Sequence, residues 1–121
     1  MANHVIDRIE GKSNLTRSHK RSKAQERETA KRTGGRLTPA SGSGAVKGDV
    51  RLKGLARIEC KTTKNKSFSV TREMVDRLET AATLSGEMPV IVVEFNDDHG
   101  RKLGELVVCP SYVLDTLLGE G

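Results

Sequence analysis

A chain of 121 residues is long enough for one domain, and a hydrophobic content of 35% allows only a modest core. It contains no apolar run of signal-peptide or membrane-spanning length, which predicts a soluble cytoplasmic protein without a membrane partner. The net charge of +5 arises at one end, because residues 1–36 hold ten Lys and Arg against four Asp and Glu.

That basic end is the first feature along the chain. Residues 1–22 show neither helical nor strand periodicity, so we expect a flexible basic segment there and a folded domain over residues 23–121. Clustered Lys and Arg attract phosphate backbones or an anionic membrane surface, or they keep a protein soluble. The charge alone leaves these three roles open.

A short, mostly polar helix is predicted from about Ser22, a plausible capping residue, to a stop at Gly34. Its thin apolar stripe suggests a position at an edge of the fold. Residues 37–46 are rich in Ser and Gly, which predicts a loop or an irregular strand. The backbone amides of such a loop can hold a phosphate, or the loop can be an ordinary turn.

Three strands should follow this loop. The first two cover residues 50–52 and 55–60, and the turn-forming pair Lys53 and Gly54 makes them neighbours in an antiparallel sheet. A brief third strand is expected over residues 67–70, after a polar turn.

In the second half of the chain, the sequence patterns that predict helices and strands are stronger. Thr71 is a good N-cap for a helix whose apolar stripe continues to Gly86. A continuous apolar run predicts a buried central strand over residues 88–95, followed by a strand over residues 103–109 and a helix over residues 112–118. The element order predicts an α/β fold, in which helices flank a mixed central sheet of about five strands.

Residues suited to catalysis lie on the first two strands. Alternation along a strand places Glu59 and Lys61 on one face, and antiparallel pairing brings Asp49 beside Glu59. Two carboxylates suit Mg²⁺ or Mn²⁺, while a neighbouring lysine stabilises a developing anion or polarises an attacking water. The same residues also fit a surface hairpin with ordinary charges.

The cysteines indicate the cellular compartment, and the aromatic residues limit how the chain could bind a nucleic acid. Cys60 and Cys109 lie inside predicted strands without metal-ligand spacing, which indicates a reducing compartment. Two Phe, one Tyr and no Trp are too few for base stacking to dominate recognition of a nucleic acid. Contacts with a nucleic acid should therefore be made mainly to its backbone.

Taken in chain order, these features resemble the PD-(D/E)xK nuclease superfamily, which has the restriction-endonuclease-like fold. The resemblance spans roughly residues 23–95 and rests on Glu26 of the first helix, Ser43 of the Ser-Gly loop, Asp49, Glu59 and Lys61. Within the superfamily, the chain is most similar to the small archaeal Holliday-junction resolvases and their phage-encoded relatives. Gly48 stands in place of the proline of the motif's name, a common substitution in the superfamily.

The resemblance implies a magnesium site, at which manganese would substitute. Asp49 and Glu59 would ligate the metal, with the backbone carbonyl of Cys60 as an additional ligand. Glu26 would complete the site directly or through water, and Glu28 is the alternative acid.

The resemblance also implies roles in binding DNA. Lys61 would orient or activate the hydrolytic water, and Ser43 would contact the scissile strand. The expected phosphate-binding residues are Lys23, Arg27, Lys31, Arg32, Arg36, Thr62, Lys64 and Lys66.

The implied function is a metal-dependent endonuclease that resolves Holliday junctions as a homodimer, in the cytoplasm of a prokaryotic or phage-infected cell. Two alternatives use the same residues differently. A nicking or degradative nuclease would apply the site to plain duplexes, because metal chemistry does not reveal the shape of the substrate. A non-catalytic basic module would bind DNA or a protein with the acids in structural roles.

Overall fold

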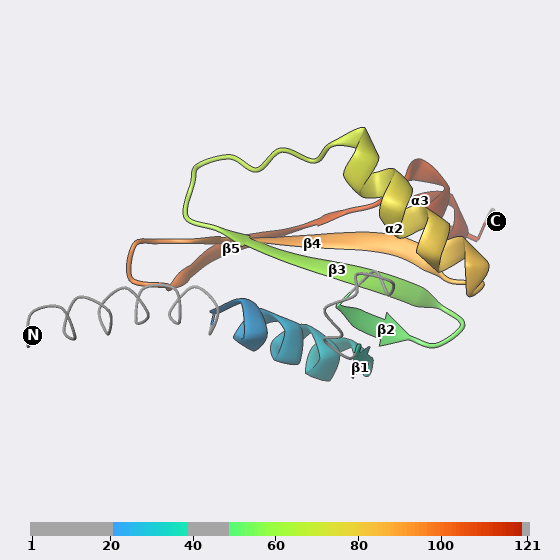
Figure 1. Ribbon diagram of the computed structural model, residues 1–121, viewed down its shortest axis with the longest axis horizontal. Coiled ribbons are helices and arrows are strands. Elements are labelled where there is room, and N and C mark those ends of the chain that lie inside the picture. Colours follow the sequence, from blue (N-terminus) through green and yellow to red (C-terminus); the bar gives the residue numbers. More distant parts are fainter. Residues whose placement is uncertain (1–20, 39–48, 120–121) are drawn as a thin grey trace, which may run out of the picture.

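The fold, seen in a computed structural model that describes residues 21–38 and 49–119, is of the predicted α/β class. Within these residues, three helices lie against a five-stranded mixed sheet with the strand order β1-β2-β3-β4-β5 (Figure 1). The strands are β1 (Arg36–Leu37), β2 (Val50–Leu52), β3 (Ala56–Thr63), β4 (Met88–Asn96) and β5 (Lys102–Val108). The helices are residues 21–33, α2 (Arg72–Leu84) and α3 (Ser111–Leu117).

Strand direction follows from the connections. β3 and β4 are parallel, and the register places Glu59 opposite Ile91. A parallel pair needs a long crossover, which α2 supplies, whereas the other neighbours are antiparallel. β4 lies between β3 and β5, so the apolar run is an interior strand as predicted.

The sheet has a small core on each face. On one face, Val50, Ile58, Cys60 and Val92 form a buried cluster with Ala30 of helix 21–33 against it. On the other face, a second buried cluster lies under α2 and consists of Leu78, Ile91 and Val93. Figure 1 shows helix 21–33 on one side of the sheet and α2 and α3 on the other. Helix 21–33 therefore covers a face of the sheet, and the predicted edge position is wrong.

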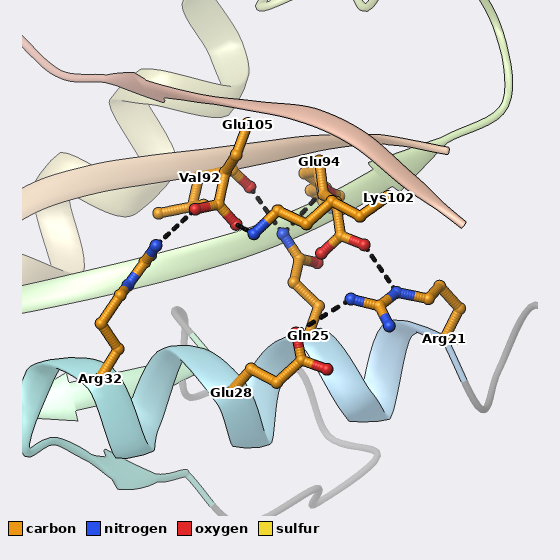
Figure 2. A network of polar contacts seen from close by, with 9 residues as sticks. Arg21, Gln25, Glu28, Arg32, Val92, Glu94, Lys102 and Glu105 are labelled. Carbon is orange, nitrogen blue, oxygen red and sulfur yellow. Dashed lines mark hydrogen bonds and ion pairs between the residues drawn. The ribbon is translucent and has the colours of Figure 1, made fainter. Parts of the chain in front are cut away.

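Polar contacts attach helix 21–33 to the sheet (Figure 2). The side chain of Gln25 is 1% exposed and donates to the backbone oxygens of Lys61 at 3.0 Å and Val92 at 3.2 Å. Arg21 Nε donates to Glu94 Oε1 at 2.6 Å, and Glu94 is fully buried. A mostly polar helix can therefore cover a sheet face, because directional bonds replace apolar contacts along it.

Helix α2 begins as the sequence predicts. Thr71 is its N-cap, and the Thr71 hydroxyl accepts a hydrogen bond from the Met74 N–H at 3.1 Å. Gly86 follows the end of the helix with a φ of 68°, a conformation that glycine adopts without strain.

Glu87 connects the β2–β3 turn to the start of β4. Its buried carboxylate accepts hydrogen bonds from Arg51 Nε at 2.7 Å, Gly54 N at 2.9 Å and Arg57 Nε at 3.1 Å. Burial opposes ionisation of Glu87, but these three donors outweigh it and hold the pKa of the carboxyl below its ordinary value. The network holds the β2–β3 hairpin in place.

Several predicted boundaries differ from the structure. β3 continues to Thr63, three residues beyond its predicted end, while β5 and α3 each begin and end one residue earlier than predicted. Ser22 lies inside helix 21–33 and does not cap it, since Arg21 is already helical. Leu55 belongs to the turn before β3, and Leu37 belongs to β1, where it pairs with β2. Residues 67–70 form no strand, because no strand of the sheet runs beside them and they lead across to α2. Among the described helices, none is long and apolar enough to span a membrane.

Candidate active site

Asp49 lies where β2 leaves β3. Its backbone N–H donates to the Ile58 oxygen at 2.7 Å, and its carboxylate oxygen Oδ2 accepts from the Cys60 N–H at 2.8 Å. The side chain of Asp49 thus takes the place that a backbone carbonyl of β2 would have occupied in the ladder. Hydrogen bonds from and to the backbone of β3 therefore hold the Asp49 carboxylate at this edge of the strand.

Glu59 and Lys61 project from the face of β3 opposite Ile58 and Cys60, as the alternation predicts. Lys61 Nζ lies 3.1 Å from Glu59 Oε2, and the two side chains are 36% and 22% exposed. The pair opens into a pocket of about 220 Å³ between β3 and α2. An ammonium and a carboxylate are therefore accessible together beside Asp49.

Glu26 approaches from helix 21–33. Its side chain is 19% exposed and lies 3.8 Å from Lys23 Nζ. Burial raises the pKa of the Asp49 carboxyl, the Cys60 N–H partly offsets this, and the negative charges of Glu59 and Glu26 raise it further. The charges of Glu59 and Glu26 thus both act on Asp49 at the edge of β3.

Glu28 has a different environment. It is 56% exposed and pairs with Arg21 Nη2 at 3.0 Å. It is not among the charges that shift the pKa of Asp49. The geometry therefore favours Glu26 over Glu28 as the acid nearest the site.

Cys60 contributes its backbone and not its thiol. The N–H of Cys60 points to the Asp49 edge, and in a strand the carbonyl of the same residue points to the same edge. The thiol lies in the core under helix 21–33, and burial raises its pKa to about 12. A thiol that stays protonated at neutral pH is neither a nucleophile nor a metal ligand.

The types of donor suit a hard cation, but no His, Cys, Asp or Glu trio in residues 21–38 and 49–119 is arranged to hold a metal ion. Glu59 is turned toward Lys61, and Asp49 Oδ2 toward the Cys60 N–H. Carboxylate and carbonyl oxygens are the ligands that Mg²⁺ and Mn²⁺ prefer. A divalent ion would also offset the burial of the Asp49 charge and its repulsion by Glu59 and Glu26, which together raise the pKa of Asp49.

The predicted DNA-binding residues lie in helix 21–33, in β1, at the end of β3 and in the turn after β3. Thr62 and Lys64 line a hollow of about 480 Å³ at the far end of β3, and Thr62 Oγ1 lies 3.3 Å from Ser22 Oγ. Arg32 Nη1 is engaged by Glu105 at 2.6 Å (Figure 2). The remaining side chains are exposed or half-buried in helix 21–33, in β1 and in the turn after β3: Lys23, Arg27, Lys31, Arg36 and Lys66.

Two arginines that line these cavities were not predicted from the sequence. Arg21 lines the hollow that holds Thr62, and Arg77 of α2 lines the pocket that holds Glu59 and Lys61. Neither belongs to a motif, so only the packing of the helices against β3 reveals them. Ser43 and residues 1–20 lie outside the described residues, and their predicted roles stay predictions.

Comparisons of the chain with protein-family models, with curated proteins and with solved structures each found no match.

Proposed function

We propose that the protein is a metal-dependent endonuclease of the PD-(D/E)xK type that hydrolyses phosphodiester bonds of branched DNA, with the Holliday junction as substrate. One observation carries this proposal. Asp49 lies at the edge of β3 close to the Glu59–Lys61 pair, and burial first, then the negative charges of Glu59 and Glu26, raise the pKa of its carboxyl. A carboxylate whose pKa is raised by burial and by neighbouring charges, beside an accessible lysine, is typical of functional sites.

Mg²⁺ is the proposed cofactor, with Mn²⁺ able to substitute. The carboxylates of Asp49, Glu59 and Glu26 and the backbone carbonyl of Cys60 are the proposed ligands. When bound, such an ion polarises a phosphoryl oxygen and lowers the pKa of a bound water.

The residues of the chain would position the reactants around that ion. Lys61 exchanges Glu59 for a phosphate oxygen and donates a hydrogen bond to it or to the attacking water. Asp49 keeps its place through the Cys60 N–H while its second oxygen remains free to act. Ser43 is proposed to contact the scissile strand.

DNA binding is proposed to run through phosphates. The exposed cations of helix 21–33, together with Thr62 and Lys64 in the hollow at the end of β3, support this. Contacts of this kind do not read sequence and weaken steeply with salt. A four-way junction has four phosphate-lined arms that such a surface can follow.

We also propose a homodimer, because a junction is resolved by paired cuts on opposing strands. Exposed apolar side chains on β5 and α3 support a protein partner at this end of the sheet. They are Leu103, Leu106 and Val107 of β5, Leu114 and Leu117 of α3, and Leu118 directly after α3. The proposed compartment is one that contains DNA, the cytoplasm of a prokaryotic or phage-infected cell.

A non-catalytic DNA-binding module is the second candidate. The observation that favours it is the internal pairing of the acids, since Glu59 contacts Lys61 and Asp49 contacts the Cys60 N–H. In this case the acids would serve the fold and the basic residues would serve DNA.

The deciding experiment compares a labelled immobile four-way junction with a linear duplex of matched sequence, in Mg²⁺ or EDTA. Wild type should make paired cuts in the junction alone, EDTA should abolish them, and Glu59→Gln should abolish them too. Glu79→Gln is the matched control, because Glu79 binds the Tyr112 hydroxyl at 2.8 Å outside the site. Equal cutting of both substrates would indicate a nicking nuclease. Binding of the junction without cutting in Mg²⁺ would indicate the binding module.

A further inference from the structure

The pocket beside Glu59 and Lys61 has a second wall, which comes from α2. Its lining residues are Glu59, Lys61, Thr71, Glu73, Met74, Arg77 and Leu78. Two cations, Lys61 from β3 and Arg77 from α2, thus line one space of about 220 Å³.

Arg77 is held only loosely by its own helix. Its Nη2 donates to Glu73 Oε1 at 2.8 Å, one turn earlier, and the two side chains are 64% and 74% exposed. An exposed pair of this kind contributes little to stability, because water screens it. A guanidinium has five N–H donors, so the bond to Glu73 leaves most of them available to a ligand.

The chemistry of this wall suits a phosphodiester. A guanidinium presents a planar fork of donors that matches phosphate oxygens, and Lys61 supplies a point charge on the opposite wall. The first turn of α2, capped by Thr71, adds backbone N–H groups at the positive end of a helix of 13 residues. Glu73 gives Arg77 a partner that a phosphate can displace.

We propose that Arg77 binds the DNA phosphate that enters this pocket, so that the backbone at the cleaved position passes between β3 and the first turns of α2. This inference rests on the proposed nuclease function and extends it. Arg77 touches the substrate and positions it, while the acids and Lys61 carry the reaction. The DNA path would therefore include the α2 face of the sheet as well as helix 21–33.

Arg72 is a natural control for Arg77. It lies on the same helix and pairs with Asp76 at 3.8 Å, also four residues apart, and its side chain is 93% exposed. It does not line the pocket. Replacing Arg72 therefore removes the same charge from the same helix without touching the proposed phosphate site.

The test measures binding and cleavage of a labelled four-way junction by wild type, Arg77→Ala, Arg77→Lys and Arg72→Ala. Binding is followed by fluorescence anisotropy in EDTA over a range of salt concentrations, and cleavage is followed in Mg²⁺. We expect Arg77→Ala to weaken binding roughly tenfold and to reduce the slope of log K against log salt by about one. Arg77→Lys should keep the slope but lose part of the cleavage rate, and Arg72→Ala should match wild type.

Two results would overturn the inference. The first would leave the nuclease proposal intact, and the second would overturn both proposals. If wild type binds and cleaves the junction but Arg77→Ala and Arg72→Ala have equal slopes and rates, Arg77 is no phosphate ligand and the nuclease proposal stands. If wild type neither binds nor cleaves, both proposals fail together. Circular dichroism of each variant verifies the fold, and both arginines are exposed enough that their replacement should leave it intact.

Discussion

The carboxylate of Asp49 accepts a hydrogen bond of 2.8 Å from the backbone N–H of Cys60, at the point where β2 stops pairing with β3. This bond replaces one link of the sheet ladder by a side chain. The hydrogen bond fixes the position of one oxygen of the Asp49 carboxylate. The carboxylate still has its second oxygen and its negative charge.

Asp49→Asn should stabilise the metal-free protein. Folding raises the pKa of Asp49, so its favourable contribution is complete below the unfolded pKa of about 3.9 and is lost as pH rises through the folded value. Asn is neutral at every pH and can still accept from the Cys60 N–H. We expect the melting temperature at pH 7 in EDTA to rise by a few degrees, since about 1 kcal/mol corresponds to roughly 4–8 °C in a small domain.

Mg²⁺ should reverse the order of the melting temperatures of wild type and Asp49→Asn. It should raise the melting temperature of wild type and leave that of Asp49→Asn unchanged, because binding to the folded state alone stabilises it. Differential scanning calorimetry with Mg²⁺ or EDTA measures both effects. A variant less stable than wild type in EDTA would mean that the charge of Asp49 supports the fold.

Glu26→Gln should lower the cleavage rate by about 10- to 100-fold, the usual cost of disturbing a metal's surroundings. Glu28→Gln is its matched control, because Glu28 lies two residues away on the same helix and pairs with Arg21. It should cleave at nearly the wild-type rate. Single-turnover cleavage of the junction in Mg²⁺ measures both rates, and the reverse order would assign the site to Glu28.

Glu87 should make the protein sensitive to acid. Its folded pKa is lowered, so the stability that it contributes is present above the unfolded pKa of about 4.3 and disappears as pH falls through the folded value. Glu87→Gln should cost about 3–5 kcal/mol at pH 7, because Arg57 is then buried beside a neutral partner. Urea unfolding between about pH 3 and pH 7 should show a smaller loss in acid for the variant than for wild type. Equal acid sensitivity would assign the effect to other carboxylates.

Leu106→Glu should convert a dimer into a monomer. Leu106 is 55% exposed on β5, an edge strand of the described sheet, and a charge there opposes burial against a second copy. Leu55→Glu is the control, since Leu55 is 54% exposed but lies in the β2–β3 turn at the other side of the sheet. Light scattering should give about twice the 13.2 kDa of one chain for wild type and for Leu55→Glu, and the single mass for Leu106→Glu. A monomeric wild type at working concentration would contradict the proposed dimer.

Local signals were sufficient for much of the fold. Thr71, the apolar run of β4 and the turn at Gly54 act through neighbours in sequence, and each was predicted correctly. Residues 67–70 were predicted wrongly, because a strand also needs a partner, and composition does not say whether one runs alongside. The position of helix 21–33 was missed for a related reason. Its buried face is polar, so the apolar stripe understated how much of the helix packs against the sheet.

In the candidate site too, local sequence patterns predicted some of the residues, whereas contacts between elements were not predicted. Alternation along β3 correctly placed Glu59 and Lys61 on one face, and the short β2–β3 turn correctly placed Asp49 beside them. The approach of Glu26 from another element rested on family resemblance, and Arg77 was not foreseen. Contacts between elements depend on how helices cross a sheet, which no spacing along the chain encodes.

The polar docking of helix 21–33 has a consequence for how finely Glu26 is placed. Apolar contacts have no preferred direction, whereas Gln25 donates to two particular backbone oxygens, so its bonds depend on the orientation of the helix. Glu26 is the next residue, so a rotation of the helix by one position, about 100°, would break both bonds and carry this acid away from Asp49. Gln25 therefore fixes the rotation of the helix about its axis. Although Gln25 lies away from the proposed site, it determines the direction in which Glu26 projects.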